Sequence, residues 1–454
     1  MIMSKAKSAS QEFQMTTGSI PRAIFLYSIP LIIGNFLQQL YNTMDSLIVG
    51  NFVGPEALAA VGASGTLTFL LISFCIGASS GAGILISRYF GGKDYDELDK
   101  AVHTTIALSI VMGAVISVLG IILTPLLVRA VGTTKPVVPQ AELYLRIYFL
   151  GVIFNVIYNM ASGILNAVGD SKRSLRYLAI ASITNIVLDF VFVAIFDMGI
   201  AGAAIATDIS QLVSCVCIMG YLFRTNAAYH VTFKKIHLHK KTAVSILKLG
   251  IPTAIQNAVI AFSNMLIQAG VNVYGTSAMA GFTAYMKVDG FNILPIMSFS
   301  LAATTFTGQN IGAGRFDRVK KGLYTVVVMG LIYTIGVSVI MLSFAKPIIT
   351  MLSRDPHVIQ YGVMALWSLA PYYCLLSIIH TLAGTVRGSG KTLPPMVIIL
   401  FSLCLCRIAW IHLVAPHFNS IWGVYYTYPI SFIIGAILMI LYTWKGKWME
   451  IKRL

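Results

Sequence analysis

Apolar residues occur along this chain in long runs that are separated by short polar stretches. A helix that spans the hydrocarbon core of a bilayer needs about 20 residues, and twelve runs have a suitable length. They lie near 22–48, 57–86, 101–125, 138–164, 175–196, 200–223, 243–270, 278–306, 322–345, 357–384, 393–414 and 420–444. The pattern predicts an all-α integral membrane protein with twelve transmembrane helices.

Lysine and arginine are distributed unevenly between alternate connections. Of the 32 basic residues, 25 lie in the two terminal segments and in every second loop, and five lie in the other loops. Basic residues concentrate on the cytoplasmic side of membrane proteins. We therefore expect both termini to be cytoplasmic, which agrees with an even number of spans, and we expect no cleavable signal peptide before the first run.

The chain contains an internal repeat. The segment SRYFGGKDYDELDKAVHT (87–104) aligns without gaps on GQNIGAGRFDRVKKGLYT (308–325), an offset of 221 residues. The same offset carries Gly54 to Gly275 and Gly169 to Gly390. Each half holds six runs, so the halves are predicted to be parallel repeats, an architecture typical of secondary transporters. The predicted division is an N-lobe at 1–224, a basic cytoplasmic linker at 225–242 and a C-lobe at 243–454.

Composition supports the membrane assignment. The chain is 57% hydrophobic and 11% charged, against about 25% charged residues in soluble domains. The net charge of +16 is explained by topology, and we expect no nucleic-acid partner. The six cysteines all lie in apolar runs and show no disulfide or zinc-ligand spacing.

Several motifs suggest chemistry that their context does not support. GSGKT at 388–392 lacks the first glycine of a phosphate-binding loop, because Thr385 stands there, so we predict no nucleotide site. Gly77 and Gly81 in GASSGAG are predicted to form a small-residue face for close helix packing. The histidines of KKIHLHKK (234–241) have no further metal ligands nearby. We expect no enzyme activity, no cofactor and no metal site beyond a possible Na⁺ site.

Four of the 16 acidic residues lie inside predicted spans: Asp45, Asp189, Asp208 and Asp289. Asn185 precedes Asp189 by four residues, which places both on one face of a helix. A charge inside a membrane costs about 2.5 to 3.5 kcal/mol even on the most lenient scale. The residue that lies 221 positions away from each of these acids, in the other half of the chain, is not an acid. The two halves therefore share the helical pattern but not the intramembrane acids. This favours a function located in one lobe.

The residues leave several interpretations open. Two buried carboxylates that lie close together can bind a proton reversibly, and carboxylate, amide and hydroxyl oxygens can also coordinate Na⁺. The alternative is structural: a hydrogen-bonded contact between helices, or a salt bridge to the intramembrane bases Lys287 or Arg407. For Asp289, pairing with Arg407 is a specific alternative.

The chain resembles the multidrug and toxin extrusion (MATE) family, within the wider superfamily of lipid-linked oligosaccharide exporters. The resemblance covers nearly the whole chain. It rests on the twelve spans in two halves, the opening SIPLIIGNFLQQLYNTMDSLIVGNFVG, and the matched GGKDYDE and IGAGRFDRVKK loops. It implies an antiporter that expels amphipathic, often cationic, compounds in exchange for inward H⁺ or Na⁺.

The resemblance also implies roles for particular residues. In one branch of the family an N-lobe ion site uses residues that fall here on Asp45, Asn185, Asp189 and Thr207. Pro30 matches the proline at which the first helix is proposed to bend. Gln38 and Asn159 match polar positions of the N-lobe cavity, and we add Asp208, Asp289 and Gln256 as substrate-cavity candidates. The chain departs from another branch, because its seventh span carries no acid.

The predicted function is alternating-access antiport of amphipathic, cationic small molecules by a monomer in a bacterial cytoplasmic membrane. The main alternative is a flippase for lipid-linked oligosaccharide or another lipid-like cargo. A strongly cationic cavity would favour the flippase, since such cargo carries pyrophosphate. The balance of four intramembrane acids against two bases favours cationic cargo.

Overall fold

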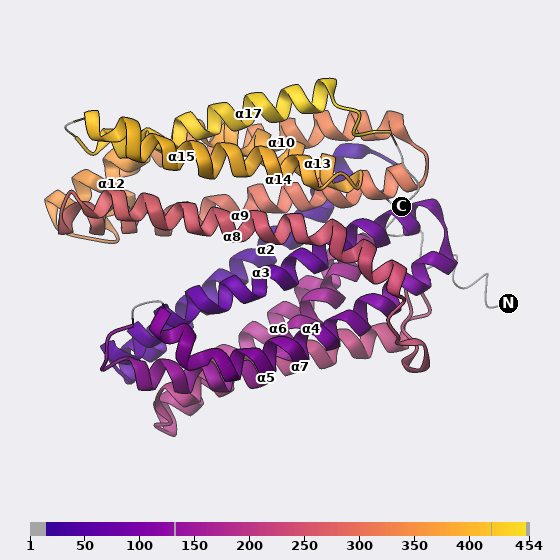
Figure 1. Ribbon diagram of the computed structural model, residues 1–454, viewed down its shortest axis with the longest axis horizontal. Coiled ribbons are helices and arrows are strands. Elements are labelled where there is room, and N and C mark those ends of the chain that lie inside the picture. Colours follow the sequence, from indigo (N-terminus) through magenta and orange to yellow (C-terminus); the bar gives the residue numbers. More distant parts are fainter. Residues whose placement is uncertain (1–14, 131–132, 419, 451–454) are drawn as a thin grey trace. The chain divides into compact units, whose positions relative to one another are not determined.

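The protein is described here from a computed structural model, which describes residues 15–130, 133–418 and 420–450. The described chain is helical, as the apolar runs predict, and contains no strand (Figure 1). Eleven of its helical stretches are long and apolar enough to cross a membrane. The remaining predicted span is α9 (Thr276–Gly312), which is long enough but is interrupted by polar residues such as Lys287 and Asp289.

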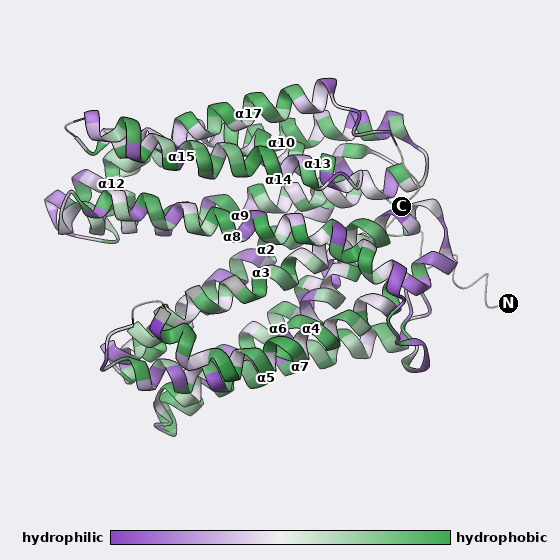
Figure 2. Cartoon of the chain, in the orientation of Figure 1, coloured by the Kyte–Doolittle hydropathy of each residue, from purple (hydrophilic) through white to green (hydrophobic). Residues whose placement is uncertain are grey.

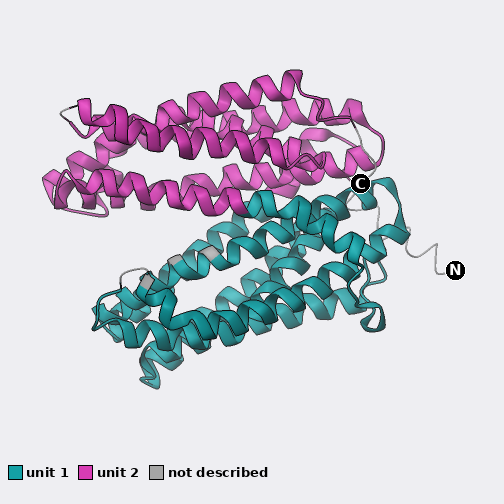
Figure 3. Cartoon of the chain, viewed as in Figure 1, with its two compact units in different colours: residues 1–14, 29–254 teal, residues 15–28, 255–454 magenta. Residues whose placement is uncertain are grey.

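Two compact units make up the chain. Unit 1 comprises Met1–Gln14 and Ile29–Ala254, and unit 2 comprises Met15–Ser28 and Ile255–Leu454 (Figure 3). Two long helices, α2 (Ile20–Phe52) and α8 (Lys240–Asn272), contribute to both units, because the first turns of each helix belong to one unit and the remaining turns to the other. The segment 225–242 lies within unit 1. The predicted division of the chain into lobes at 224 and 243 stays a prediction.

Unit 1 is built around α5, which packs against α3, α4 and α7. Its hydrophobic core is formed by side chains of these helices, with contributions from the first turns of α8. The helices of unit 1 are α2 (Ile20–Phe52, from Ile29), α3 (Pro55–Gly92), α4 (Tyr95–Ala130), α5 (Val138–Ala167), α6 (Ser171–Asp189), the π-helical η1 (Phe190–Ile195), α7 (Gly199–Arg224), the 3₁₀ turn η2 (Phe233–Lys235) and α8 (Lys240–Asn272, to Ala254).

Unit 2 has a core of its own, in which α13 packs against α9, α10 and α17. Pro371 removes a backbone donor, and a 3₁₀ turn separates α12 from α13 at that point. The remaining elements are α10 (Phe316–Ser343), α11 (Ala345–Thr350), α12 (Pro356–Leu369), η3 (Ala370–Tyr372), α13 (Tyr373–Gly388), α14 (Leu393–Leu400), η4 (Phe401–Leu405), α15 (Cys406–Ala409), η5 (Trp410–Val414), η6 (Ala415–His417), α16 (Trp422–Tyr425) and α17 (Thr427–Lys445).

The backbone repeats at the offset that the sequence predicts. Three pairs of residues 221 positions apart have positive φ angles: Gly54 and Gly275 (120° and 95°), Lys93 and Gly314 (57° and 70°), and Gly169 and Gly390 (96° and 86°). Left-handed backbone favours glycine, which has no Cβ to clash. Both halves therefore make the same sharp turns after the first, second and fourth spans.

Hydrophobic side chains cover the outer faces of the helices as well as the cores. Ile122, Leu126 and Ile332 are more than 60% exposed, and hydrophobic residues continue along the helices of each unit while hydrophilic ones gather at the helix ends (Figure 2). Soluble proteins seldom expose apolar surface on this scale. The protein is a multi-pass membrane protein.

The predicted small-residue face of α3 is confirmed. Gly77 and Gly81 lie directly against the first turns of α8, where a Cβ on Gly77 would stand 2.8 Å from the Gly250 carbonyl oxygen and one on Gly81 would stand 2.9 Å from Gly250 Cα. Such distances are shorter than real Cβ contacts, so the two backbones meet with no room for a side chain.

Residues 15–18, which precede α2, are tied to the ends of α9 and α10. Their carbonyl oxygens accept hydrogen bonds of 2.8 to 3.2 Å from Asn310, Arg315 and Arg318. The segment before α8 is tied in unit 1 in a comparable way: Thr232 N–H donates to His103 Nε2 (2.9 Å), and Lys235 pairs with Asp99 (3.1 Å). Each half of the repeat thus holds the segment that leads into the first helix of the other half.

Replacing Arg318 by alanine is expected to release residues 15–18. The substitution removes the three hydrogen bonds to their carbonyls, each contributing about 1 kcal/mol. Hydrogen exchange in residues 15–28 should rise, and exchange in α13 should stay unchanged. Lys320→Ala is the matched control, because no hydrogen bond from the Lys320 side chain is found among the described residues. Equal exchange in both variants would show that Arg318 does not hold this segment.

Candidate functional site

The polar face of α6 lies inside unit 1. Asp170 caps the helix by accepting from the Arg173 N–H (3.2 Å), and the helix then runs to Asp189, where six π-helical residues follow. Asn185 and Asp189 are one turn apart and are 1% and 0% exposed. π-Helical turns are rare and often lie at functional sites, since they redirect side chains.

The structure brings the four predicted ion-site residues together. Asp45 of α2 and Thr207 of α7 are buried. Asn185 Nδ2 donates to Thr207 Oγ1 at 3.5 Å, and the Asp45 and Asp189 carboxylates are close enough to interact electrostatically. The distant helix α2 and the successive helices α6 and α7 therefore place two carboxylates, an amide and a hydroxyl in one buried cluster.

Oxygen atoms of this cluster lack hydrogen-bond partners. Among the described residues, Asp45 Oδ1, Asn185 Oδ1 and both Asp189 oxygens are buried and accept no hydrogen bond. A buried acceptor without a donor is unfavourable by about 1 to 3 kcal/mol, and more when it is charged. The cluster is thus an acceptor-rich site that a proton, a small cation or a substrate ammonium group would complete.

Tyrosine side chains surround the carboxylates and were not identified from the sequence. Tyr41 and Tyr144 both lie within electrostatic range of Asp45 and Asp189. The Tyr144 ring stacks on that of Tyr148, with centroids 6.4 Å apart and planes at 12°. The spacing of Tyr41, four residues before Asp45, was an available signal, because positions i and i+4 share a helix face.

Asp208 lies beside this cluster, one residue after Thr207. Its carboxyl group packs against the backbone of α5 at Gly151, where a Cβ would overlap it. Asp208 Oδ1 and the nearby Gln211 Oε1 are buried and unpaired among the described residues, and Tyr148 lies within interaction range of both side chains. Glycine at position 151 is what allows the carboxylate to reach this position.

The predicted cavity residues fall in both units. In unit 1, Gln38 is exposed one turn before Tyr41, and Asn159 donates to the backbone and side chain of Asn155 (2.9 and 2.8 Å). Gln256 and Asp289 belong to unit 2. Gln256 is buried and its Oε1 is unpaired among the described residues.

Pro30 lies within α2, which continues through it from Ile20 to Phe52. Proline has no backbone N–H, so the carbonyl four residues earlier loses its helical donor. The backbone hydrogen bonding of α2 is therefore weakened at Pro30, about four helical turns before Asp45. Whether the helix bends there stays a prediction.

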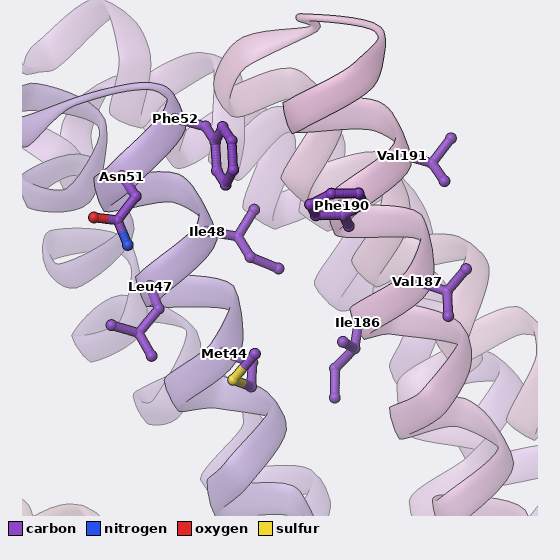
Figure 4. A pocket seen from close by; sticks show the side chains of 9 residues that line it. All are labelled: Met44, Leu47, Ile48, Asn51, Phe52, Ile186, Val187, Phe190 and Val191. Atoms are coloured by element: carbon purple, nitrogen blue, oxygen red, sulfur yellow. The ribbon is translucent and has the colours of Figure 1, made fainter.

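A groove of about 560 Å³ lies between α2 and the end of α6. Figure 4 shows Ile48 and Phe52 of α2 facing Phe190 across it, and the two phenyl rings meet edge to face at 6.1 Å. Met44 and Phe190, which line it, are sequence neighbours of Asp45 and Asp189. The groove and the two carboxylates thus lie on the same two helical segments, although neither carboxylate is among the residues that line the groove. Its lining is Met44, Leu47, Ile48, Asn51, Phe52, Ile186, Val187, Phe190 and Val191.

Within the three described stretches of chain, no group of three or more His, Cys, Asp or Glu side chains could hold a metal ion. The cluster at Asp45 and Asp189 offers two carboxylates and neutral oxygens only. It is therefore suited to a weakly held, exchangeable ion better than to a resident transition metal.

Comparison with known proteins identifies the family. The family model MatE matches twice, at residues 30–191 and 252–411. The chain belongs to the MatE family. The two matches begin at Pro30 and Pro252 and coincide with the two halves of the repeat, so the predicted resemblance and the duplicated architecture are confirmed. Members of the MatE family are membrane transporters, and this protein is a transporter of small molecules and not an enzyme.

Relatives and solved structures agree with this assignment. The chain is 31% identical to the "Probable multidrug resistance protein YpnP" of Bacillus subtilis (strain 168), over 97% of this chain and 98% of the relative. It is 24% identical to the "FAD transporter" of Shewanella oneidensis, over 93% and 94%. A solved MatE structure, described as the outward-facing conformation of a multidrug resistance transporter, superimposes with a TM-score of 0.88 at 24% identity, covering 94% of this chain and 96% of that chain. This last likeness shows the fold.

Proposed function

We propose that this MatE transporter is a secondary antiporter that exports amphipathic, cationic compounds in exchange for inward H⁺ or Na⁺. The observation that carries the proposal is the buried pair Asp45 and Asp189 with its unpaired acceptor oxygens. Its location is the cytoplasmic membrane of a bacterium, with both termini inside, and a single chain performs the transport. The relative named as a multidrug resistance protein supports export of drug-like compounds.

Exchange follows from the chemistry of the cluster. The carboxylates attract both the coupling ion and the ammonium group of a substrate, and the negative charge can be neutralised by one or the other. An ion that binds one conformation more tightly than the other shifts the equilibrium toward that conformation. Ion entry from outside therefore weakens substrate binding at the apolar groove on the same helices, and release of the ion inside restores it.

The weakened ladder of α2 at Pro30 supports a movement of this helix when the ion binds. α2 carries Asp45 on the cluster and Met44, Ile48 and Phe52 on the groove. A bend at Pro30 would alter both surfaces at once, because they lie on neighbouring faces of the same helix. Rocking of two lobes, 1–224 and 243–454 joined by 225–242, then alternates access.

A flippase for lipid-linked oligosaccharide or other lipid-like cargo is the alternative. It is favoured by one observation, the buried guanidinium of Arg407 in unit 2, since pyrophosphate cargo needs basic partners. The acceptor cluster in unit 1 does not suit an anionic cargo. The two functions differ in their need for an ion gradient.

The test is efflux of a fluorescent lipophilic cation from proteoliposomes, with a pH gradient and a Na⁺ gradient imposed separately. We expect one gradient to drive transport at least about tenfold faster than the other, since a site that holds H⁺ or Na⁺ must discriminate between them to couple. Protein-free liposomes control for leakage of the dye. Transport under neither gradient by folded protein would contradict antiport and lead to an assay with lipid-linked cargo.

A further inference from the structure

Unit 2 contains a buried base and an acid that do not pair with each other. Arg407, on α15, is 3% exposed, and Asp289 lies on α9. Among the residues that the structure describes, no ion pair joins the Arg407 guanidinium to a carboxylate. Asp289 therefore makes no direct salt bridge with Arg407 or Lys287 in the described part of the chain, although its carboxylate and the Arg407 guanidinium lie within electrostatic range of each other. A buried charge that contacts no opposite charge directly is unfavourable, so this arrangement calls for an explanation.

Neutral groups hold the Arg407 guanidinium in place. Its Nε donates to Ser431 Oγ (3.0 Å) and its Nη1 to Asn264 Oδ1 (3.2 Å). The guanidinium also lies over the rings of Tyr428 and Phe432, 4.5 and 5.5 Å from their centroids. A guanidinium has five N–H donors, and within the described chain Nη2 donates none. The base is fixed in position, stays charged and retains free donors.

The carboxylate of Asp289 is held separately. The Tyr373 hydroxyl donates to Asp289 Oδ1 (2.5 Å), and the Tyr285 hydroxyl lies 3.0 Å from that of Tyr373. One turn along α9, both polar side-chain atoms of Asn292 are buried and unpaired among the described residues. The acid thus has its own neutral partners, and polar atoms beside it remain available.

Tyr428 lies within electrostatic range of both charges. Its hydroxyl is buried and has no hydrogen-bond partner in the described part of the chain, while its ring packs against those of Phe432 (6.0 Å) and Phe282 (6.4 Å). The surroundings of the two charges therefore include an aromatic face and an unsatisfied hydroxyl, which are features of a ligand site.

We infer that Asp289 and Arg407 form a binding site for amphipathic molecules that carry an ammonium group and a separate anionic group. The ammonium binds at Asp289, the carboxylate or phosphate binds the free donors of Arg407, and the apolar body lies against Tyr428. Such a ligand supplies the directly contacting counter-ion that each of the two charges lacks. As a transport site it rests on the proposed export function. The headgroup of phosphatidylethanolamine has the same dipolar chemistry.

The test uses three matched probes: N-dodecyl-β-alanine, its methyl ester, which is only cationic, and its N-acetyl derivative, which is only anionic. Binding to the purified full-length protein is measured by calorimetry without any ion gradient. We expect the dipolar probe to bind about tenfold or more tightly than either derivative, the worth of one charge-assisted contact. Arg407→Gln should lower the affinity for the dipolar probe to the affinity for the ester and leave the affinity for the ester unchanged.

A second variant guards against misfolding of the first. Asn264→Asp places a carboxylate 3.2 Å from Arg407 Nη1 and satisfies the guanidinium internally, so it should also reduce dipolar binding to the ester's level while keeping the fold. Lys287→Gln removes a positive charge from the exposed face of α9 and should change nothing. Equal affinity of wild type for the dipolar probe and the ester, or an equal loss of both in Asn264→Asp, would overturn the inference.

The source of the ligand is decided by repeating the measurement in nanodiscs. Weaker binding of the dipolar probe in phosphatidylethanolamine than in phosphatidylglycerol, seen in wild type and absent in Arg407→Gln, would assign the site to a lipid headgroup. Equal binding in both would assign it to a soluble amphiphile. Because no gradient is involved, failure here leaves antiport intact, and failure of gradient-driven efflux leaves this binding result intact.

Discussion

Replacing Asp189 by asparagine is expected to abolish gradient-driven export. Asparagine keeps the shape of the side chain and removes its charge, so neither a proton nor Na⁺ is held there as before. Loss of a buried charged partner weakens cation binding by about 2 to 5 kcal/mol, or from about 30-fold to a few thousand-fold. Proteoliposome efflux of the fluorescent cation under the driving gradient measures this loss.

The same variant is expected to be at least as stable as wild type. Both Asp189 oxygens are buried without donors in the described chain, and an uncompensated buried charge opposes folding. Removing it should leave the melting temperature in detergent unchanged or higher when no coupling ion is added. Export and stability thus change in opposite directions, which a purely structural role of Asp189 would not produce.

Asp197→Asn is the matched control. It makes the same chemical change eight residues further on, where the side chain is exposed and the backbone φ is 51°. Asparagine tolerates this left-handed conformation as well as aspartate does. The control should export normally. Normal export by the Asp189→Asn protein would show that the cluster does not couple transport.

The membrane fold was predictable because lipid imposes one rule on every span. All twelve apolar runs lie in helices, and the repeat that the residues at 87–104 and 308–325 display extends to the backbone angles at Gly54 and Gly275. Hydrocarbon leaves the backbone no partner except its own helix, so length and hydropathy carry most of the information.

The π-helical segments were not predicted. A π turn differs from an α turn by one residue in the hydrogen-bond ladder, and neither composition nor hydropathy reflects this difference. The segment after Asp189 and the one at Trp410–Val414 stand about 220 residues apart. A π-helical segment is therefore present at the same place in both halves of the repeat. The acid that precedes it in the first half, Asp189, corresponds to Trp410 in the second half.

Sequence reasoning reached only part of the site. Asn185 and Asp189 share a helix face, so local spacing was enough to join them. Asp45 lies far away along the chain; it was identified from the sequence as an intramembrane acid, and the family resemblance assigned it to the same ion site as Asp189. Tyr144 and Tyr148 were missed because an aromatic residue in a span looks the same whether it faces lipid or a carboxylate. Asp289 and Arg407 were considered as a pair, but sequence does not show that Asn264, Ser431 and Tyr373 hold them apart.

The second large effect is expected from Gly250→Ala, on stability. A Cβ at this position would stand 2.8 Å from the Gly77 carbonyl carbon and 2.9 Å from Ala78 Cα. These are backbone atoms of α3 and cannot rotate away, so the two helices must separate and lose their packing. Overpacking of this kind lowers the free energy of unfolding by about 1 to 3 kcal/mol, which corresponds to a fall in melting temperature of about 3 to 10 °C for a unit of this size.

Gly220→Ala separates this close approach from the general effect of replacing a helical glycine. Gly220 lies in α7, and a Cβ there would meet nothing within 4 Å. Alanine favours the helix over glycine by about 1 kcal/mol, so this variant should melt at the wild-type temperature or slightly above it. Thermal unfolding of the two purified variants in one detergent makes the comparison. If Gly250→Ala were as stable as Gly220→Ala, α3 and α8 would not be in backbone contact, and the small-residue face at Gly77 and Gly81 would need another explanation.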